Sequence, residues 1–258
     1  MGSLKMRRTI IAGNWKMYKT IGESIELANG LKRELFDLAN QDIDIVLCPA
    51  FTVLTEVYEI IINSNLQLGA QDMHWQDEGA FTGEVSGKML KDAGCGFVII
   101  GHSERRQFFG ETNETVNKKI KAALKHNLAP IVCVGETLDE REKGLTFEVL
   151  NDHIHNGLKD ISAQDLLKTV IAYEPVWAIG TGKTATPAQA QEAQKYIRDL
   201  LGKIYDVKTA QDLRIQYGGS VKPENITELM QQPDVDGALV GGASLSIESF
   251  AQIVKRAS

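Results

Sequence analysis

The sequence predicts an α/β fold, and among α/β folds a single closed (β/α)8 barrel of eight parallel strands ringed by helices. Eight short apolar runs, each four to six residues long, alternate with helical patterns. The runs are continuously apolar, which is typical of strands that are covered on both faces. The chain length of 258 residues suits such a barrel. An open doubly wound sheet is the alternative that alternation alone leaves open.

The eight apolar runs are rich in Val and Ile, and most are bounded by Gly, Pro or Asn, which interrupt regular structure. They occupy residues 9–12, 43–48, 66–70, 97–100, 129–134, 169–173, 213–217 and 237–240. No low-complexity segment, charge block or long linker divides the chain, so we expect one barrel domain over residues 1–258. Residues 1–6 are expected to be a short extension or cloning remnant ahead of the fold.

A helical pattern follows the first apolar run. Residues 23–38 carry an apolar stripe at close to helical spacing. The stripe is formed by Ile25, Leu27, Leu31 and Leu35. We therefore expect a helix there with one face against the strands.

Three later helices have starts that can be recognised in the sequence. Thr186 is expected to be an N-cap, with Pro187 at the first helical position and Gln189 completing a capping box. Lys222-Pro223-Glu224 is predicted to open another helix in the same way, and Ser246 to cap the final one. Each start follows an apolar run, as alternation of strands and helices requires.

Composition and net charge indicate which kinds of molecule this chain binds. The 28 basic and 34 acidic residues give a net charge of −6, which argues against nucleic acid, because a phosphate backbone demands a basic face. A small anion held by a few local donors remains compatible. We expect no membrane span, since no apolar run approaches about eighteen residues. Cys48, Cys95 and Cys133 lack Cys-x-x-Cys spacing. Cys48 and Cys133 lie inside apolar runs, so we expect these two to be buried reduced thiols, and a reducing cytoplasm fits them.

Polar residues cluster just past the strand ends. Asn14 and Lys16 follow the first apolar run, His102 the fourth, Glu174 the sixth and Ser220 the seventh. In a barrel these ends share one face, where active sites are built. This convergence is the main functional signal in the sequence.

Glu174 is the candidate catalytic base. Pro175 and Trp177 stiffen the chain behind it, ahead of the Gly-Thr-Gly turn at residues 180–182. We interpret residues 175–185 as a lid with stiff ends and a mobile middle, able to close over a substrate and exclude water. Shielding from water raises the pKa of a carboxylate, which suits a general base. The alternative is a structural carboxylate bonded to nearby backbone N–H groups.

His102 lies in Gly101-His102-Ser103-Glu104-Arg105-Arg106, where a strand end turns into a helix. The positive end of a helix dipole disfavours imidazolium, so we expect a neutral ring that donates a hydrogen bond to a developing oxyanion. A lone histidine is nevertheless more often structural than catalytic. Glu104 is compatible with a capping and ion-pair cluster, and that interpretation is favoured for Arg105 and Arg106.

The remaining candidates concern anion binding. Strand alternation would put Asn14 and Lys16 on one side, as a neutral donor and a positive charge, although this spacing alone is a weak signal. Tyr217-Gly218-Gly219-Ser220 and Val240-Gly241-Gly242-Ala243 follow the last two strands. Glycines let the backbone approach a ligand, and phosphate sites recur at this place in barrels. The alternative is two tight turns.

Together these motifs resemble the triosephosphate isomerase family, nearly from end to end. The shared stretches are Gly13-Asn14-Trp15-Lys16, Gly79-Ala80-Phe81-Thr82-Gly83-Glu84, Gly101-His102-Ser103-Glu104-Arg105-Arg106, Cys133-Val134-Gly135-Glu136-Thr137, residues 172–185, Tyr217-Gly218-Gly219-Ser220 and Val240-Gly241-Gly242-Ala243. The resemblance implies interconversion of dihydroxyacetone phosphate and D-glyceraldehyde 3-phosphate, with no metal or organic cofactor. The family is itself a standard example of a carboxylate base, a neutral histidine and a closing loop.

The resemblance also implies a role for each site residue. Glu174 would shuttle a proton between the two carbons of an enediolate. His102 and Asn14 would donate hydrogen bonds to its oxyanion, and Lys16 would supply positive charge to the oxyanion and the phosphate. Glu104 would support Lys16 and His102. The phosphate would be bound by backbone N–H groups of Gly180, Ser220, Gly241 and Gly242.

The family is usually a homodimer. The segment 73–84, which begins at Met73 and ends at Glu84, resembles the loop that inserts into the partner, with Thr82 close to the partner's active site. Trp75 and Phe81 in this segment are apolar surface that an interface would cover.

Two other functions stay open at this point. One is a different phosphate-binding barrel enzyme, which the intact Glu174 segment and the context of His102 disfavour. The other is a barrel retained for binding or as a scaffold. The sequence excludes this function poorly, because one misplaced loop can lower the rate about a hundredfold while every motif is intact.

At position 72 the family more often has Asn. We expect Asp72 to alter local hydrogen bonding without affecting the chemistry.

Overall fold

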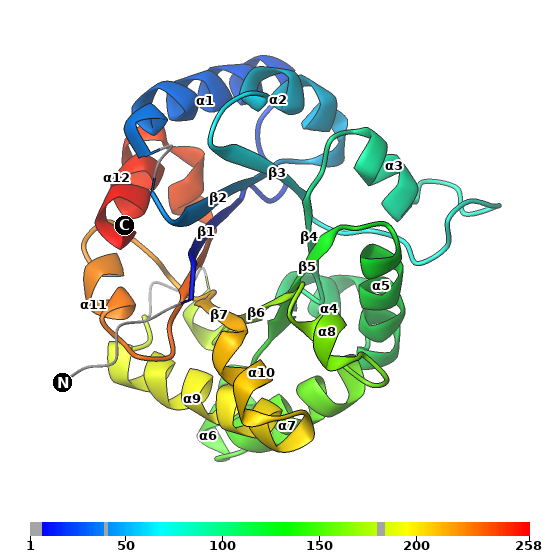
Figure 1. Cartoon of the computed structure of the whole chain (residues 1–258), viewed down its shortest axis with the longest axis vertical. Helices are drawn as coiled ribbons and strands as arrows, with labels where there is room; N and C mark the ends of the chain where they lie inside the picture. The colour runs from blue at the N-terminus through cyan, green and yellow to red at the C-terminus, as the bar shows by residue number, and fades with distance from the viewer. Residues whose placement is uncertain (1–6, 39–40, 180–183) are drawn as a thin grey trace.

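Eight parallel strands pair in sequence order and close on themselves in the computed structural model, which describes residues 7–38, 41–179 and 184–258. Figure 1 shows the strands at the centre and the helices as a ring around them. The predicted (β/α)8 barrel is confirmed, and the open doubly wound sheet is excluded because β1 pairs with both β2 and β8. The expected extension at residues 1–6 lies outside the described residues.

The strands agree closely with the predicted runs. They are β1 Thr9–Asn14, β2 Ile43–Cys48, β3 Leu66–Ala70, β4 Phe97–Ile100, β5 Ala129–Val134, β6 Val170–Tyr173, β7 Arg214–Tyr217 and β8 Gly237–Val240. β1 continues two residues past the predicted end, so Asn14 is its last residue and does not follow it. β6 and β7 each begin one residue later than predicted.

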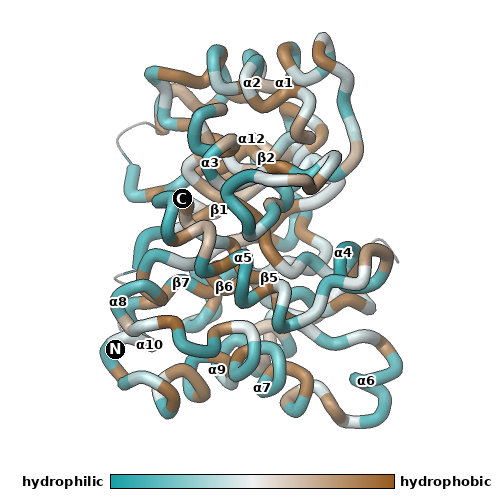
Figure 2. The backbone as a smooth tube through the Cα atoms, turned by 90° about the vertical axis from the view of Figure 1, so that its right-hand side faces the viewer, coloured by the Kyte–Doolittle hydropathy of each residue, from teal (hydrophilic) through white to brown (hydrophobic). Residues whose placement is uncertain are grey.

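The helices occupy the connections between strands. The α-helices are α1 Ile21–Glu34, α2 Leu54–Ile61, α3 Gly87–Asp92, α4 Ser103–Phe109, α5 Asn113–Lys125, α6 Leu138–Glu142, α7 Thr146–Gly157, α8 Ala163–Leu166, α9 Pro187–Ile204, α10 Val207–Asp212, α11 Ile226–Met230 and α12 Ile247–Ala257. Short 3-10 turns are η1 Phe36–Leu38, η2 Phe51–Val53, η3 Val176–Ala178 and η4 Gly242–Leu245. Figure 2 shows apolar and polar stretches alternating along the helices of the ring, as expected for elements with one buried side.

Two of the predicted helix starts are confirmed and two helix predictions need correction. Thr186 and Ser246 cap α9 and α12 with their side chains, as predicted. The stretch 23–38 is two elements, since α1 ends at Glu34 and η1 follows. Ile25 is 37% exposed because it lies two residues, about 200° around the helix, from Leu27 on the buried face.

The other correction concerns α11. It begins at Ile226, later than the predicted opening at Lys222. The Lys222 N–H donates to Oδ1 of Asn225 at 2.9 Å, which makes residues 222–225 a turn ahead of the helix.

Alternate strand residues build two apolar layers, one inside the barrel and one between strands and helices. The inner layer comes almost wholly from strand positions and includes Ile10, Ala12, Val46, Cys48, Phe97, Ile99, Ile131, Cys133, Val170, Ala172 and Leu239. At the closing seam the two backbones approach so closely that a Cβ at Gly237 would lie 1.8 Å from the carbonyl oxygen of Ile10. Glycine at this position is therefore a requirement of closure.

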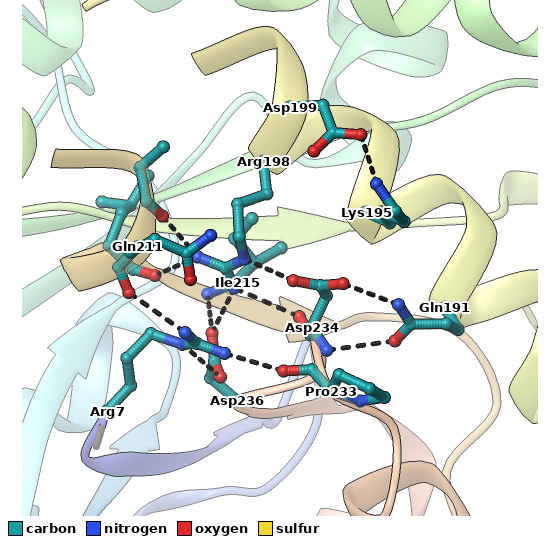
Figure 3. A network of polar contacts seen from close by, with 12 residues as sticks. Arg7, Gln191, Lys195, Arg198, Asp199, Gln211, Ile215, Pro233, Asp234 and Asp236 are labelled. Atoms are coloured by element: carbon teal, nitrogen blue, oxygen red, sulfur yellow. Dashed lines mark hydrogen bonds and ion pairs between the residues drawn. The ribbon is translucent and has the colours of Figure 1, made fainter. Parts of the chain in front are cut away.

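A buried ion network holds the amino-terminal end of the barrel together (Figure 3). The carboxylate of Asp236, next to β8, accepts from Nε of Arg7 at 2.7 Å and from NH2 of Arg198 on α9 at 2.8 Å. It also accepts the backbone N–H of Ile215 on β7 at 2.9 Å. Arg198 bonds Asp234 as well, at 2.6 Å. One carboxylate thus connects the start of β1, the last two strands and α9.

We expect Asp236→Asn to lower the free energy of unfolding by about 3–5 kcal/mol, because it removes a charge that compensates the buried guanidinium of Arg198 and the partly buried one of Arg7. Urea unfolding at one fixed protein concentration measures this. Lys195→Ala is the matched control, since Lys195 pairs with Asp199 on the exposed face of α9, where loss of a pair costs below about 1 kcal/mol. Equal losses in the two variants would contradict the role given to Asp236.

Candidate active site

The carboxyl ends of the strands surround a cavity of about 390 Å³. Most predicted site residues line it, namely Asn14, Lys16, His102, Glu174, Ser220, Gly241 and Gly242. Glu104 does not line this cavity but reaches it through Lys16, whose Nζ lies 2.5 Å from Oε1 of Glu104. Gly180, the remaining predicted phosphate ligand, lies outside the described residues.

Glu174 is held with its carboxylate buried at the end of β6. Its N–H donates to the carbonyl of Val134 at 2.8 Å, which continues the pairing with β5 for one more residue. The two backbones are so close there that a Cβ on Gly135 would lie 1.7 Å from the carbonyl oxygen of Glu174. Oε2 of Glu174 accepts the N–H of Ser103 at 3.0 Å, and Oε1 lies 3.0 Å from Nε2 of His102.

The predicted rise in the pKa of Glu174 is wrong in this arrangement. Burial alone raises this pKa, as the sequence argument assumed. His102, the Ser103 N–H and Lys16 all favour the charged form, and together they bring the pKa of Glu174 below its ordinary value. The carboxylate is therefore ionised and available as a proton acceptor.

His102 is the N-cap of α4, as the sequence predicted. Its Nδ1 accepts the N–H of Glu104 at 3.2 Å, so a neutral ring carries its proton on Nε2, the nitrogen beside Glu174. The predicted depression of the pKa is not found. Burial lowers the pKa of His102, but the carboxylates of Glu174 and Glu104 outweigh it and raise this pKa.

Asn14 and Lys16 are brought together by a backbone turn, not by strand alternation. Lys16 lies past the end of β1 in the left-handed region, with φ of 53°. Its N–H donates to Oδ1 of Asn14 at 3.0 Å, and its carbonyl accepts from Nε2 of Gln71 at 2.8 Å. This double attachment holds the unusual backbone and aims the lysine into the cavity, where a Cβ on Gly241 would lie 3.8 Å from Nζ.

The glycine-rich end after β7 is crowded, which explains its composition, whereas a Cβ on Gly242 after β8 would meet no atom within 4 Å. A Cβ on Gly218 would come within 2.8 Å of Cγ of Glu174, and one on Gly219 within 2.2 Å of the Tyr217 hydroxyl. The N–H of Gly218 donates to the carbonyl of Tyr173 at 2.7 Å, which ties this turn to the strand that carries Glu174. The turn therefore forms one wall of the cavity at a fixed place.

Glu136 is the residue that sequence reasoning missed. It is fully buried after β5 and accepts from the hydroxyl of Tyr173 at 3.1 Å, Nε1 of Trp177 at 2.9 Å and NH1 of Arg141 at 3.0 Å. Its carbonyl accepts the N–H of Val176 at 3.0 Å. Glu136 thus fastens the beginning of the segment 175–185. A carboxylate close behind an apolar run was the available signal, since Glu136 follows the run 129–134 after Gly135, much as Glu174 follows the run 169–173.

A second cavity, of about 740 Å³, lies on the other side of Glu174, between α4, α6 and the segment that carries Trp177. Glu174 lines both cavities. Ile179 lines both cavities as well, so among the described residues Glu174 and Ile179 lie between the two spaces.

The segment 73–84 projects beside α3 and α5 (Figure 1). His74 stacks on Trp75 at 4.2 Å and contacts Phe81 at 4.5 Å, between ring centroids. Asp77 is held by His126 at 2.6 Å and by Lys125 at 2.5 Å, which fastens the segment to the end of α5.

Asp72 and the two arginines are structural, as expected. Asp72 pairs with Lys119 at 2.6 Å and with Arg105 at 2.9 Å, and burial raises the pKa of this carboxyl while the two cations oppose the rise. Arg106 donates to the carbonyl of Gly101 at 2.9 Å and to Asn113 at 2.8 Å. None of these three side chains lines the smaller cavity.

Fold and site together define an enzyme of the (β/α)8 barrel class in which a paired carboxylate and histidine lie next to a lysine and two glycine-rich turns. Within the described ranges no cluster of three or more His, Cys, Asp or Glu could hold a metal ion, and no helix is long and apolar enough to cross a membrane.

Comparison with known proteins identifies the family. The family model described as triosephosphate isomerase matches residues 9–257, and the chain belongs to this family. It is 59% identical over 249 residues to the triosephosphate isomerase of Moorella thermoacetica, covering 96% of this chain and 98% of the relative. The corresponding protein of Endomicrobium trichonymphae is 55% identical over 250 residues, covering 97% and 99%. The crystal structure of triosephosphate isomerase from Bartonella henselae matches with a TM-score of 0.87 at 37% identity, covering 96% and 98%.

The link between His102 and Glu174 predicts a measurable pKa change. Glu174→Gln removes the carboxylate that raises the pKa of His102 most, while the burial that lowers this pKa remains. The protonation midpoint of His102 should therefore move to lower pH, as followed by ring-nitrogen NMR. His155→Gln, which changes an exposed histidine on α7 that lines neither cavity, is the control for assignment. An unchanged or higher midpoint would contradict the coupling.

Proposed function

We propose that this chain is a triosephosphate isomerase, which interconverts dihydroxyacetone phosphate and D-glyceraldehyde 3-phosphate through an enediolate. Membership of the family over nearly the whole chain supports the reaction. The observation that carries the proposal is the convergence of Glu174, His102 and Lys16 on one cavity whose far wall is the glycine-rich pair of turns. A base, an oxyanion donor and an anion site therefore face one small substrate.

The base in this mechanism is Glu174. Its carboxylate would remove the proton from the carbon next to the substrate carbonyl, as electrons move onto the carbonyl oxygen to form the enediolate. The same carboxyl group would then return the proton to the neighbouring carbon, while the hydroxyl proton on the first carbon passes to the oxyanion on the second, so that the carbonyl group forms at the first carbon. Its lowered pKa supports this role because the group is already ionised, and its burial means that few water molecules compete for the proton.

The enediolate oxygens would be stabilised by His102, Asn14 and Lys16. With its proton on Nε2, the His102 ring can donate to a substrate oxygen that replaces Glu174 at this nitrogen. Once the carboxylate has turned to the substrate, the contact that raises the pKa of His102 most is lost, which favours a neutral donor. Glu104 would orient Lys16 through their ion pair.

The phosphate would lie against the backbone of Ser220, Gly241 and Gly242, beside Lys16. Gly180 would join them from the segment 175–185, which we propose acts as a lid whose beginning is held by Glu136. Exclusion of water by the lid would protect the enediolate from losing its phosphate. Since the proposed proton transfer uses side chains alone, it requires no metal or organic cofactor.

We also propose a homodimer formed through the segment 73–84, with Thr82 close to the partner's active site. Phe81 is 43% exposed, and Met17 beside the catalytic lysine is 93% exposed. Apolar side chains of this size near a site favour coverage by a second chain. We expect this assembly to work in the cytoplasm, with neither nucleic acid nor membrane as a partner.

The first test is steady-state isomerisation of D-glyceraldehyde 3-phosphate, coupled to a dehydrogenase that reports dihydroxyacetone phosphate. We expect kcat/KM of about 10⁷ to 10⁸ M⁻¹s⁻¹, close to the diffusional ceiling. A folded, dimeric sample without turnover would contradict the proposed function and favour a barrel retained for binding.

Glu174→Gln is expected to lower kcat by at least about a hundredfold, because the amide cannot accept the substrate proton. The coupled assay measures this, with Glu228→Gln on the exposed face of α11 as the matched control. Circular dichroism of both variants shows whether the fold is kept. A near-normal rate for Glu174→Gln would refute its role as the base.

Thr82→Arg is expected to dissociate the dimer, since a long charged side chain would replace a small one at the tip of the inserted segment. Light scattering after gel filtration should give the mass of two 28.4 kDa chains for the wild type and of one chain for the variant. Thr227→Arg, at an exposed position on α11, should leave the dimer intact. A monomeric wild type would refute the proposed assembly.

A further inference from the structure

The electrostatics of this chain pose a problem for its proposed substrate, and the inference below rests on that proposed function. The chain carries a net charge of −6. A phosphate monoester is close to dianionic at neutral pH, since its second pKa is about 6. The overall field of the protein therefore repels the substrate, and any attraction must come from local charges at the mouth of the site.

The charges of Lys16, Glu104 and Glu174 do not supply that attraction. Lys16 is paired with Glu104 at 2.5 Å, so its charge is largely compensated before the substrate arrives. Glu174, on the wall of the same cavity, adds a negative charge because its pKa is lowered. With these three side chains alone the site would present a net negative charge to an approaching dianion.

Lys222 is the other lysine that lines this cavity, where the described residues include no arginine. It is exposed, and among the described residues it belongs to no ion pair. Its positive charge is therefore not offset by a bound carboxylate, in contrast to Lys16. It lies two residues after Ser220, on the side of the cavity that carries the proposed phosphate ligands.

The backbone around Lys222 is held in place. The N–H of Lys222 donates to Oδ1 of Asn225 at 2.9 Å, and Nδ2 of Asn225 donates back to the carbonyl of Ser220 at 3.0 Å. The carbonyl of Pro223 accepts from NH1 of Arg256 on α12 at 2.5 Å. These hydrogen bonds hold the backbone of Lys222 beside Ser220, while its long side chain lies exposed at the opening of the cavity.

We propose that Lys222 recruits the dianionic substrate by electrostatic attraction at the mouth of the site. Its positive charge offsets the net negative charge of Lys16, Glu104 and Glu174 around the cavity. It also attracts the substrate while the substrate is still in solution. Charges at the rim of a cleft with low-dielectric walls raise the rate of encounter, and salt screens this effect over a Debye length of about 10 Å at 0.1 M. Lys222 thus contributes to kcat/KM and leaves kcat, which reports the bound complex, unchanged.

The test is a charge series at position 222, assayed from low to high ionic strength. At low salt we expect Lys222→Gln to lower kcat/KM by about three- to fivefold and Lys222→Glu by about tenfold or more, with Lys222→Arg close to the wild type. The differences should vanish at high salt, and kcat should stay within about twofold throughout. Lys203→Gln, an exposed lysine on α9 that lines neither cavity, is the matched control.

Two outcomes would overturn the proposal. If Lys222→Gln behaves like Lys203→Gln at low salt, Lys222 recruits nothing. If Lys222→Gln lowers kcat as much as kcat/KM, and equally at all salt concentrations, Lys222 contacts the transition state instead of steering the substrate.

A binding experiment tests the role of Lys222 independently of the proposed reaction. Glycerol 3-phosphate carries the same phosphate but no carbonyl, so calorimetry of its binding needs no turnover. At low salt its affinity should fall several-fold in Lys222→Gln and remain unchanged in Lys203→Gln. A wild type that binds this probe in a salt-dependent way without isomerising triose phosphates would refute the reaction and support Lys222. Equal affinity in wild type and Lys222→Gln would refute Lys222 alone.

Discussion

Closure of the sheet between β1 and β8 is the constraint on which the rest of this structure depends. It requires two backbones to meet at Gly237 and Ile10, too closely for any Cβ. The Asp236 carboxylate reinforces the same seam by binding Arg7 and Arg198. Only in a closed barrel do the carboxyl ends of the first and last strands become neighbours. That is why Lys16, from the beginning of the chain, lies beside Gly241, near its end.

The hydrogen-bond partners of the two buried carboxylates at the site differ. Two carboxylates follow strands of the barrel and are almost completely buried, yet their surroundings differ. Glu136 is satisfied by Tyr173, Trp177 and Arg141 and serves as an anchor. Glu174 has the Ser103 N–H on one oxygen and the His102 ring on the other. Glu136 therefore holds the neighbouring structure in place, whereas Glu174 borders both cavities.

The net charge of this enzyme differs from the charge around its smaller cavity. The surface is acidic overall, but the carboxylates near the cavity are matched by lysines. One of these, Lys16, is held by Glu104 and by a left-handed backbone that Asn14 and Gln71 support from either side. The other, Lys222, stands on a closed turn with its charge exposed. These local charges are the basis for our proposal that the site attracts an anion although the chain carries a net charge of −6.

The sequence by itself determined the strands, the barrel and the family, because apolar runs, glycines and caps are local properties of the chain. It also identified Glu174, His102, Asn14 and Lys16 as polar residues at strand ends. Only the tertiary structure decided the directions of the pKa shifts of Glu174 and His102 and the role of Glu136. These depend on donors and carboxylates far away in sequence: His102 and Glu174 are 72 positions apart but 3.0 Å from each other. The strength of an electrostatic interaction depends on the distance between the charges in space, and the spacing of residues along the chain does not give that distance.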